Sequence, residues 1–242
     1  MKTLFITDNS TELTIADHEV VLVLDERASS SDFTLRIGAH AQVNYLWLAG
    51  ETSDAEITRT VKIGDHSELT AWQLFSGESS AKFRLDHQLG EQVKFINKVL
   101  VHKGGTAQLT VTDYYRFQEP SAYGRFEIEG FVTGLANLSY SSDLQIAPAA
   151  QQTDSRIDMK LHLLGREARG LLLPGLQIDA NDVKAGHSAT TFKLSPEDAF
   201  YLQSRGLATD QIKALLLRSS LNHFLAGLDD QELKAKVMSR LL

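Results

Sequence analysis

The sequence contains no cysteine. This absence excludes disulfides, thiolate nucleophiles, CxxC redox chemistry and every metal site that needs a thiolate ligand. A metal bound by this chain alone would therefore need histidine and carboxylate ligands. Proline is also scarce, at 4 of 242 residues, so no proline-rich linker divides the chain.

Long apolar runs and excess positive charge are also missing. No run of about 18 apolar residues occurs, which argues against a membrane-spanning helix, and residues 1–10 lack the apolar stretch of a signal peptide. The formal net charge is −7. An acidic chain without a basic stripe binds nucleic acid or anionic membranes poorly, because that binding depends on neutralising phosphates. We expect a cytoplasmic protein that binds neither.

Glycines recur through the first half at intervals of 12 to 14 residues: Gly38, Gly50, Gly64, Gly77, Gly90 and Gly104. The runs between them are rich in β-branched residues and alternate in polarity, which indicates an all-β fold. Hairpins of a sandwich or barrel, or stacked coils of a solenoid, would both give such spacing. The nearly constant interval favours the solenoid, although spacing alone leaves the two almost equal.

Strands are expected over residues 33–37, 43–48, 56–63, 68–75, 82–89, 93–101, 107–117, 125–131, 135–146, 157–164, 170–173 and 176–178. The pattern then becomes helical. Ser195 with the proline and acids that follow it predicts a helix start, and Gly206 a helix end. A second helix is expected from Thr209 to Gly227, and a third after Asp229. The predicted division is a β core over residues 1–194 and a helical subdomain over residues 195–242.

The segment 182–207, DVKAGHSATTFKLSPEDAFYLQSRGL, resembles the C-terminal signature of SufB and SufD, proteins of iron–sulfur cluster assembly. Gln152-Thr153-Asp154 and the glycines Gly130 and Gly134 also resemble family features. The resemblance is clear over residues 85–226 and extends weakly to about residue 30. It implies a right-handed parallel β-helix core with a C-terminal helical subdomain. It further implies that SufB- and SufD-like chains pair through their β-helices, each carrying a SufC-type ABC ATPase on its helices.

Three departures from the family shape the expected role. Family members usually have a longer N-terminal helical region, the position after Lys184 is often cysteine but here is Ala185, and the core cysteine used by SufB is missing. A SufD-like partner role, or a reduced scaffold, fits these departures better than cluster assembly on this polypeptide alone. We expect a non-enzymatic scaffold that docks the ATPase and pairs with a SufB-like chain or a second copy. No stably bound cofactor is expected, and a cluster only transiently with a partner chain.

His187 is the candidate cluster-binding residue, because the resemblance aligns it with a SufD histidine near the SufB–SufD interface. Imidazole is a suitable iron ligand. The alternative is a structural histidine that donates to a backbone carbonyl at the solenoid end.

Two pairs of adjacent acid and histidine residues, Asp86-His87 and Asp17-His18, are expected on the surface. Neighbours in a strand point to opposite faces, so neither pair can chelate one ion. With no HxH or HExxH spacing, no metal site is predicted.

The helical tail offers the candidate partner-binding residues, because aromatic and arginine side chains make effective interface anchors. They are Phe200, Tyr201, Arg205, Gly206, Leu216 and Phe224. The alternative for Phe200, Leu216 and Phe224 is that they dock the helices onto the end of the solenoid.

Paired carboxylates support a rival hypothesis, a carbohydrate-active β-helix enzyme, with Glu127/Glu129 or Asp179/Asp182 as the pair. Acids two residues apart are more commonly just the solvent face of a strand.

Other sequence features give no enzymatic signature: no P-loop, GxGxxG or GxSxG motif occurs. His162 is expected to be an ordinary strand residue rather than a ligand. The run 114–117 with Phe126 resembles a binding face, but in a solenoid such residues more commonly stack inside the coils. An inert solenoid is the third possibility.

Overall fold

A computed structural model describes residues 2–6, 10–26, 32–49 and 56–241. Within these ranges the chain forms strands β1 to β15 and then helices α1 to α3. The odd-numbered strands are β1 (Lys2–Ile6), β3 (Val20–Asp25), β5 (Gln42–Ala49), β7 (Glu68–Gly77), β9 (Lys94–Lys103), β11 (Tyr123–Val132), β13 (Asp154–Leu163) and β15 (Lys184–Lys193). The even-numbered strands are β2 (Glu12–Ile15), β4 (Phe33–Ile37), β6 (Glu56–Ile63), β8 (Ala81–Leu89), β10 (Gln108–Phe117), β12 (Asn137–Ile146) and β14 (Arg169–Ile178). The helices are α1 (Pro196–Ser204), α2 (Thr209–Phe224) and α3 (Gln231–Ser239).

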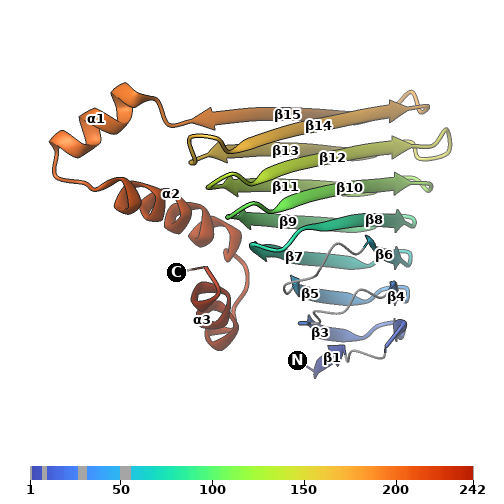
Figure 1. Ribbon diagram of the computed structural model, residues 1–242. Coiled ribbons are helices and arrows are strands. Elements are labelled where there is room, and N and C mark those ends of the chain that lie inside the picture. The colour runs from blue at the N-terminus through green and yellow to red at the C-terminus, as the bar shows by residue number, and fades with distance from the viewer. Residues whose placement is uncertain (1, 7–9, 27–31, 50–55, 242) are drawn as a thin grey trace.

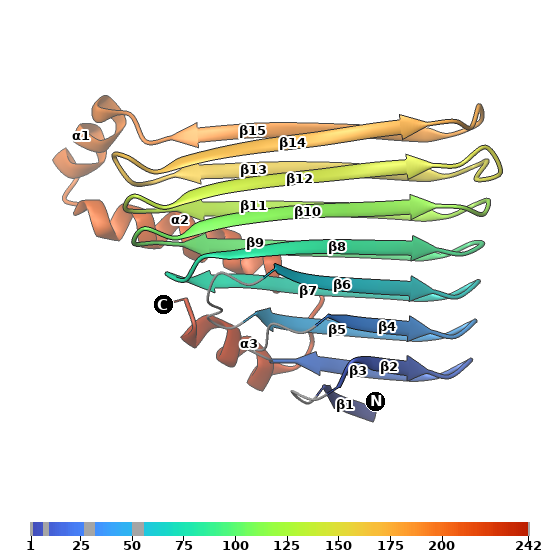
Figure 2. The same ribbon diagram turned by 45° about the vertical axis from the view of Figure 1, so that its right-hand side comes forward.

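The strands wind into a parallel β-solenoid (Figures 1 and 2). The odd-numbered strands form one eight-stranded sheet and the even-numbered strands a seven-stranded sheet, each in chain order. Every pairing is parallel between the described strands, so no hairpin joins neighbours. The parallel β-helix prediction is confirmed, and the hairpin sandwich is excluded.

Successive coils stack in register, so equivalent residues form columns. Gln42 pairs with Glu68, and Glu68 in turn with Lys94. The glycine interval seen in the sequence is half a coil, because each coil has two strands and two corners. Gly64 shows why a corner needs glycine: a Cβ there would lie 2.8 Å from backbone atoms of the coil below. Gly50 lies outside the described residues.

The corners between even- and odd-numbered strands share one unusual backbone conformation. A residue with positive φ, between 50° and 62°, occurs in six of these corners: His18, His40, His66, Gln92, Ser121 and Gln152. Such a conformation is uncommon for residues other than glycine. Its repetition shows that the stacked corners impose the same turn on different side chains.

Four strands were missed by the periodicity of the sequence: β1, β2, β3 and β15. In β3 the reason is double burial, since residues 21–25 are all buried and no alternation remains. The strand β14 was expected in two pieces interrupted by Pro174 and Gly175, but it is continuous. It is the edge strand of its sheet, where proline is tolerated.

The main core fills the lumen of the solenoid with side chains from alternate positions of every strand. In β10 the alternation is complete, with every second residue from Leu109 to Phe117 buried. The predicted aromatic stacking inside the coils is confirmed for Tyr115, Phe117 and Phe126. The rings of Tyr115 and Phe126 are stacked with their centroids 3.5 Å apart. Tyr114 instead lies on the outer face, between Arg84 and Arg116.

A second hydrophobic cluster joins the C-terminal helices to the outer face of the eight-stranded sheet. Strand residues such as Leu46, Trp72 and Leu100 pack in it against Leu221 and Phe224 of α2. The helices therefore run back along the solenoid from its last coil toward its first (Figure 1). The helix starts and ends expected from the sequence agree with the structure, whereas the division into two domains stays a prediction. No described helix combines the length and apolarity needed to cross a bilayer.

Candidate functional site

The last coil, formed by β14 and β15, leaves one end of the solenoid open. His187 of β15 pairs in register with Ile157 of β13, whose side chain is fully buried in the lumen. In-register pairing keeps side chains on the same face, so His187 points along the core column. It is exposed because no further described coil covers it. Leu176 and Ile178 of β14, in register with the buried Leu144 and Ile146, are 37% and 40% exposed for the same reason.

The candidate residues of the helical tail divide into two groups. Phe200 and Tyr201 on α1 are 73% and 57% exposed, and Arg205 lies over the Tyr201 ring with its guanidinium 5.3 Å from the ring centroid. Gly206 is exposed and ends the helix with a φ of +86°. On α2, Leu216 is half-buried against the second cluster and Phe224 is buried in it. For Phe224 the structure therefore favours the docking alternative.

A cleft of about 400 Å³ lies between α2 and the part of the eight-stranded sheet formed by β9, β11, β13 and β15. Its lining includes Lys98, Glu127, Glu129, Asp158, Lys160, Ser188 and His223. Lys98 Nζ donates to the backbone carbonyls of His223 and Ala226, at 3.2 and 2.9 Å. A cation at the C-terminus of a helix satisfies free carbonyls and complements the helix dipole. The lysine thus anchors the end of α2 to β9.

Both glutamates of this cleft are bound to histidine. Glu127 lies 3.0 Å from His223 Nε2 of α2, and Glu129 lies 2.7 Å from His162 Nε2 of β13. Ser220 of α2 also donates to Glu129, at 2.8 Å. Burial opposes ionisation of Glu129, but the hydrogen bonds from His162 and Ser220 outweigh it and hold its pKa below the usual range. These contacts clamp α2 onto the sheet.

This arrangement removes the basis for the carbohydrate-active enzyme. Glu127 and Glu129 share a strand face as expected, but their partners occupy them beneath α2. Asp179 and Asp182 lie far from them, in the corner between β14 and β15. The two pairs therefore do not build a common groove with free carboxylates.

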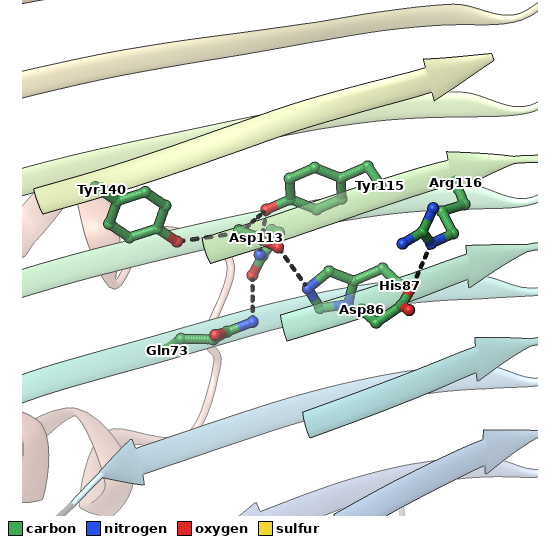
Figure 3. Close-up of polar contacts among 8 residues, drawn as sticks. Gln73, Asp86, His87, Asp113, Tyr115, Arg116 and Tyr140 are labelled. Carbon is green, nitrogen blue, oxygen red and sulfur yellow. Dashed lines mark hydrogen bonds and ion pairs between the residues drawn. The ribbon is translucent and has the colours of Figure 1, made fainter. Parts of the chain in front are cut away.

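A polar network is buried inside the lumen and converges on Asp113 of β10 (Figure 3). The hydroxyls of Tyr115 and Tyr140 donate to Asp113 Oδ2, at 2.7 and 3.1 Å. Asn97 donates to the Tyr115 hydroxyl at 2.7 Å, and Gln73 donates to Asn97 at 3.1 Å. Every bond in this chain points its donor toward the carboxylate. The network therefore surrounds the buried Asp113 side chain with hydrogen-bond donors.

The same network corrects the expectation that both residues of the Asp86-His87 pair lie on the surface. They do point to opposite faces, but His87 is buried at 1% exposure, with Nε2 3.1 Å from Asp113 Oδ1. These two atoms lie close together without hydrogen-bond alignment, and His87 Nδ1 has no hydrogen-bond partner among the described residues. Asp86, on the outer face, accepts from Arg116 Nε at 2.8 Å. Asp17 and His18 are exposed as expected, although they lie in a corner.

Burial and the charge of Asp113 raise the pKa of Tyr115 and of Tyr140 well above the ordinary tyrosine value. Both hydroxyls therefore keep their protons and act only as donors to the carboxylate. The members of the network lie on β7, β8, β9, β10 and β12, so it links neighbouring coils inside the lumen. In the described part of the chain, no group of three or more histidine or acidic side chains is arranged to hold a metal ion.

Comparison with known proteins shows which family the chain belongs to. A family model described as "SUF system FeS cluster assembly, SufBD core domain" matches residues 1–220. The chain belongs to the SufBD family. The iron–sulfur cluster assembly protein SufD of Escherichia coli (strain K12) is 22% identical over 238 residues, which cover 95% of this chain and 55% of that protein. SufD of Bacillus subtilis (strain 168) is 26% identical over 141 residues, 58% of this chain and 32% of that protein.

A SufBD family protein of Synechocystis is 35% identical over 82 residues, 34% of this chain and 18% of that protein. The chain thus spans about half the length of the E. coli SufD and smaller shares of the other two. In the structure, the SufBD-like signature segment covers the last corner, β15 and α1. It therefore connects the open end, where His187 lies, to the exposed helix that carries Phe200 and Tyr201.

Sequence reasoning missed the Lys98 anchor and the bonds of Glu129 in this SufBD chain, because each joins residues far apart in sequence. One missed residue did have a local signal. His87 lies two residues from both Leu85 and Leu89, which point inward, so the alternation of β8 places it in the lumen. The prediction for His162 is confirmed in that it is a strand residue, and it also holds Glu129.

We expect Asp113→Ala to lower the free energy of unfolding by about 3–5 kcal/mol, because it leaves His87 and two tyrosine hydroxyls buried without their partner. Asp86→Ala is the matched control. It removes a partly exposed ion pair with Arg116 and should cost about 1 kcal/mol or less. Urea denaturation of the parent and both variants measures the difference. Equal losses from the two substitutions would contradict the structural role of the network.

The Glu129 clamp predicts a specific loss of stability in acid. Its pKa in the folded chain is below the ordinary value of 4.5, so its stabilisation is present above that pH and disappears as the pH falls through the folded pKa. Glu129→Gln should therefore cost about 1 kcal/mol near neutral pH and flatten the decline in stability between about pH 5 and 3. Glu127→Gln is the control, because it alters the exposed contact with His223, which contributes less than the half-buried bonds of Glu129. Parallel pH profiles for the parent and Glu129→Gln would refute the clamp.

Proposed function

We propose that this chain is a SufD-like scaffold subunit of iron–sulfur cluster assembly. In this role it pairs with a second SufB- or SufD-like chain through its open last coil and carries a SufC-type ABC ATPase on its helices. The observation that carries the proposal is the uncovered last coil: His187, Leu176 and Ile178 are in register with buried residues of the coil before it and are themselves exposed. The SufBD membership supplies the context in which this surface has a partner.

The open end supports pairing on physical grounds. Both β14 and β15 are edge strands, each with one side free of a described neighbour. Unpaired strand edges and uncovered apolar core side chains favour addition of another chain. A SufB-like partner seated there would cover Leu176 and Ile178 and would place His187 inside the interface.

His187 then has a defined part in the proposal. It contributes one imidazole ligand toward a cluster, which is the cargo of the assembly. Because this chain has no cysteine, the thiolates that usually hold iron–sulfur clusters would come from the partner chain. Binding of the cluster would thus depend on pairing and would be transient.

The exposed side of α1 supports docking of the ATPase. The helix projects away from both sheets in Figures 1 and 2. It carries Phe200 and Tyr201, and Leu215 on α2 is also 59% exposed. Apolar aromatic side chains with an adjacent arginine are the residue types that dominate binding energy at protein interfaces.

Pairing predicts that Leu176→Asp in the core column weakens association with the host's SufB-like chain by at least about tenfold. A buried charge without a partner opposes docking at that column. Leu173→Asp on the outer face of the same strand, where Leu173 is 47% exposed, should change it little. Analytical ultracentrifugation of the mixed chains measures both. Equal effects of the two variants, or no complex of the parent chain at micromolar concentration, would overturn the pairing.

Docking predicts that Phe200→Ala with Tyr201→Ala reduces binding of the host's SufC-type ATPase by at least about tenfold without loss of stability, since both side chains are exposed. The control is Glu232→Ala, which alters an exposed residue of α3, a helix outside the proposed surface. A pull-down with purified ATPase and circular dichroism of each variant separates binding from folding. Unchanged binding by the double variant would reject α1 as the docking site.

A further inference from the structure

Three exposed histidines stand in a row at the edge of the solenoid opposite the helices. His18, His40 and His66 occupy the same position in the corners that connect β2 to β3, β4 to β5 and β6 to β7. Figure 1 shows these corners on the side away from α1. The rings of His18 and His40 are parallel within 3° with centroids 4.9 Å apart, and those of His40 and His66 within 7° at 4.8 Å. We call these three residues the histidine ladder.

The coil stacking, rather than any local motif, builds the ladder. The histidines are separated by 22 and 26 residues, so no short spacing pattern reveals them. Their φ angles of 60°, 55° and 57° are those of the common corner conformation, which fixes all three Cα–Cβ bonds in the same direction. Two later corners carry glutamine in this position, Gln92 and Gln152. Histidine is therefore not needed for the turn itself.

The ladder presents free imidazole nitrogens beside fixed negative charge. Among the described residues, none of the three rings makes a hydrogen bond or an ion pair, and their ring contacts are with one another. Asp17 and Asp65 immediately precede two of them. Their Oδ1 atoms accept from the backbone N–H groups of Ala39 and Glu91, at 2.8 and 2.9 Å. These bonds hold the carboxylates at the corners, where they attract cations.

We propose that the ladder binds one divalent transition-metal ion of the class that prefers imidazole, such as Cu²⁺, Ni²⁺ or Zn²⁺, through His40 and one neighbour. The stacked rings hold their nitrogen lone pairs side by side, so two rings must turn to converge on one ion. Exposed side chains change rotamer within nanoseconds. Two histidines are the only protein ligands in this proposal, and water molecules occupy the remaining coordination positions. The site is independent of the scaffold role and lies on the opposite edge from α1.

The experiment compares variants that each remove one imidazole but differ in the pairs they leave. His18→Gln keeps the adjacent pair of His40 and His66. His40→Gln leaves His18 and His66, which are separated by one whole coil and do not contact each other. Glutamine is the matched replacement, because Gln92 already occupies this position. With Zn²⁺ as the probe, isothermal titration calorimetry of the metal-free chain should show affinity reduced about twofold by His18→Gln, since two equivalent pairs become one. His40→Gln should reduce it by about tenfold or more.

A rescue variant makes the test sharper. Gln92→His adds an imidazole to the next corner, beside His66. The double variant His40→Gln/Gln92→His therefore has one adjacent pair, and its affinity should return to the level of His18→Gln, about half that of the parent chain. Circular dichroism checks that every variant keeps the β-solenoid. Equal effects of His18→Gln and His40→Gln would show that isolated surface histidines bind the ion and would overturn the proposal. So would failure of the rescue, or absence of Zn²⁺ binding by the parent chain.

Discussion

In-register parallel stacking of coils is the constraint on which the rest of this structure depends. Strands in such a stack lie about 4.8 Å apart, and each residue sits directly above its equivalent in the previous coil. Equivalent residues of successive coils therefore form columns, and each column has its own pattern of burial, polarity and backbone conformation. Lumen columns are mostly apolar, with one buried polar network around Asp113. Corner columns repeat one backbone turn, and outer columns determine which elements pack on the outside of the solenoid. The open end is the unavoidable result of stopping such a stack.

Two outer columns of the eight-stranded sheet explain where the helices lie. One column runs through Leu24, Leu46, Trp72, Lys98, Glu127 and Asp158. Its neighbour runs through Leu48, Leu74, Leu100, Glu129 and Lys160. Both change from apolar to charged within the middle coils. The apolar half is covered by the second hydrophobic cluster, and the charged half holds the end of α2 through Lys98, Glu127 and Glu129. A single helix thus bridges a hydrophobic contact and a polar one.

Much of this architecture could be predicted from the sequence, because period-two alternation and the half-coil glycine interval are local signals. The strands that failed prediction lack those signals. Residues 21–25 of β3 are buried on both faces, and β15 at the open end has alternating positions that are all partly exposed. The helices were found because Ser195, Gly206 and Asp230 are local markers of their ends. For example, the Asp230 side chain accepts from the N–H groups of Glu232 and Leu233.

The candidate sites were less predictable because they are made by columns and by contacts across the chain. Lys98 meets α2 more than a hundred residues later, and the histidine ladder joins three corners. His187 was identified only through family resemblance. What the structure adds is the reason for its exposure: it belongs to a lumen column that ends. In Ile157 the same position is buried, so one more coil would turn His187 into a core residue. The function proposed for this chain therefore follows from where the stack stops, since a partner that continues the column would bury His187 and complete the core in the same step.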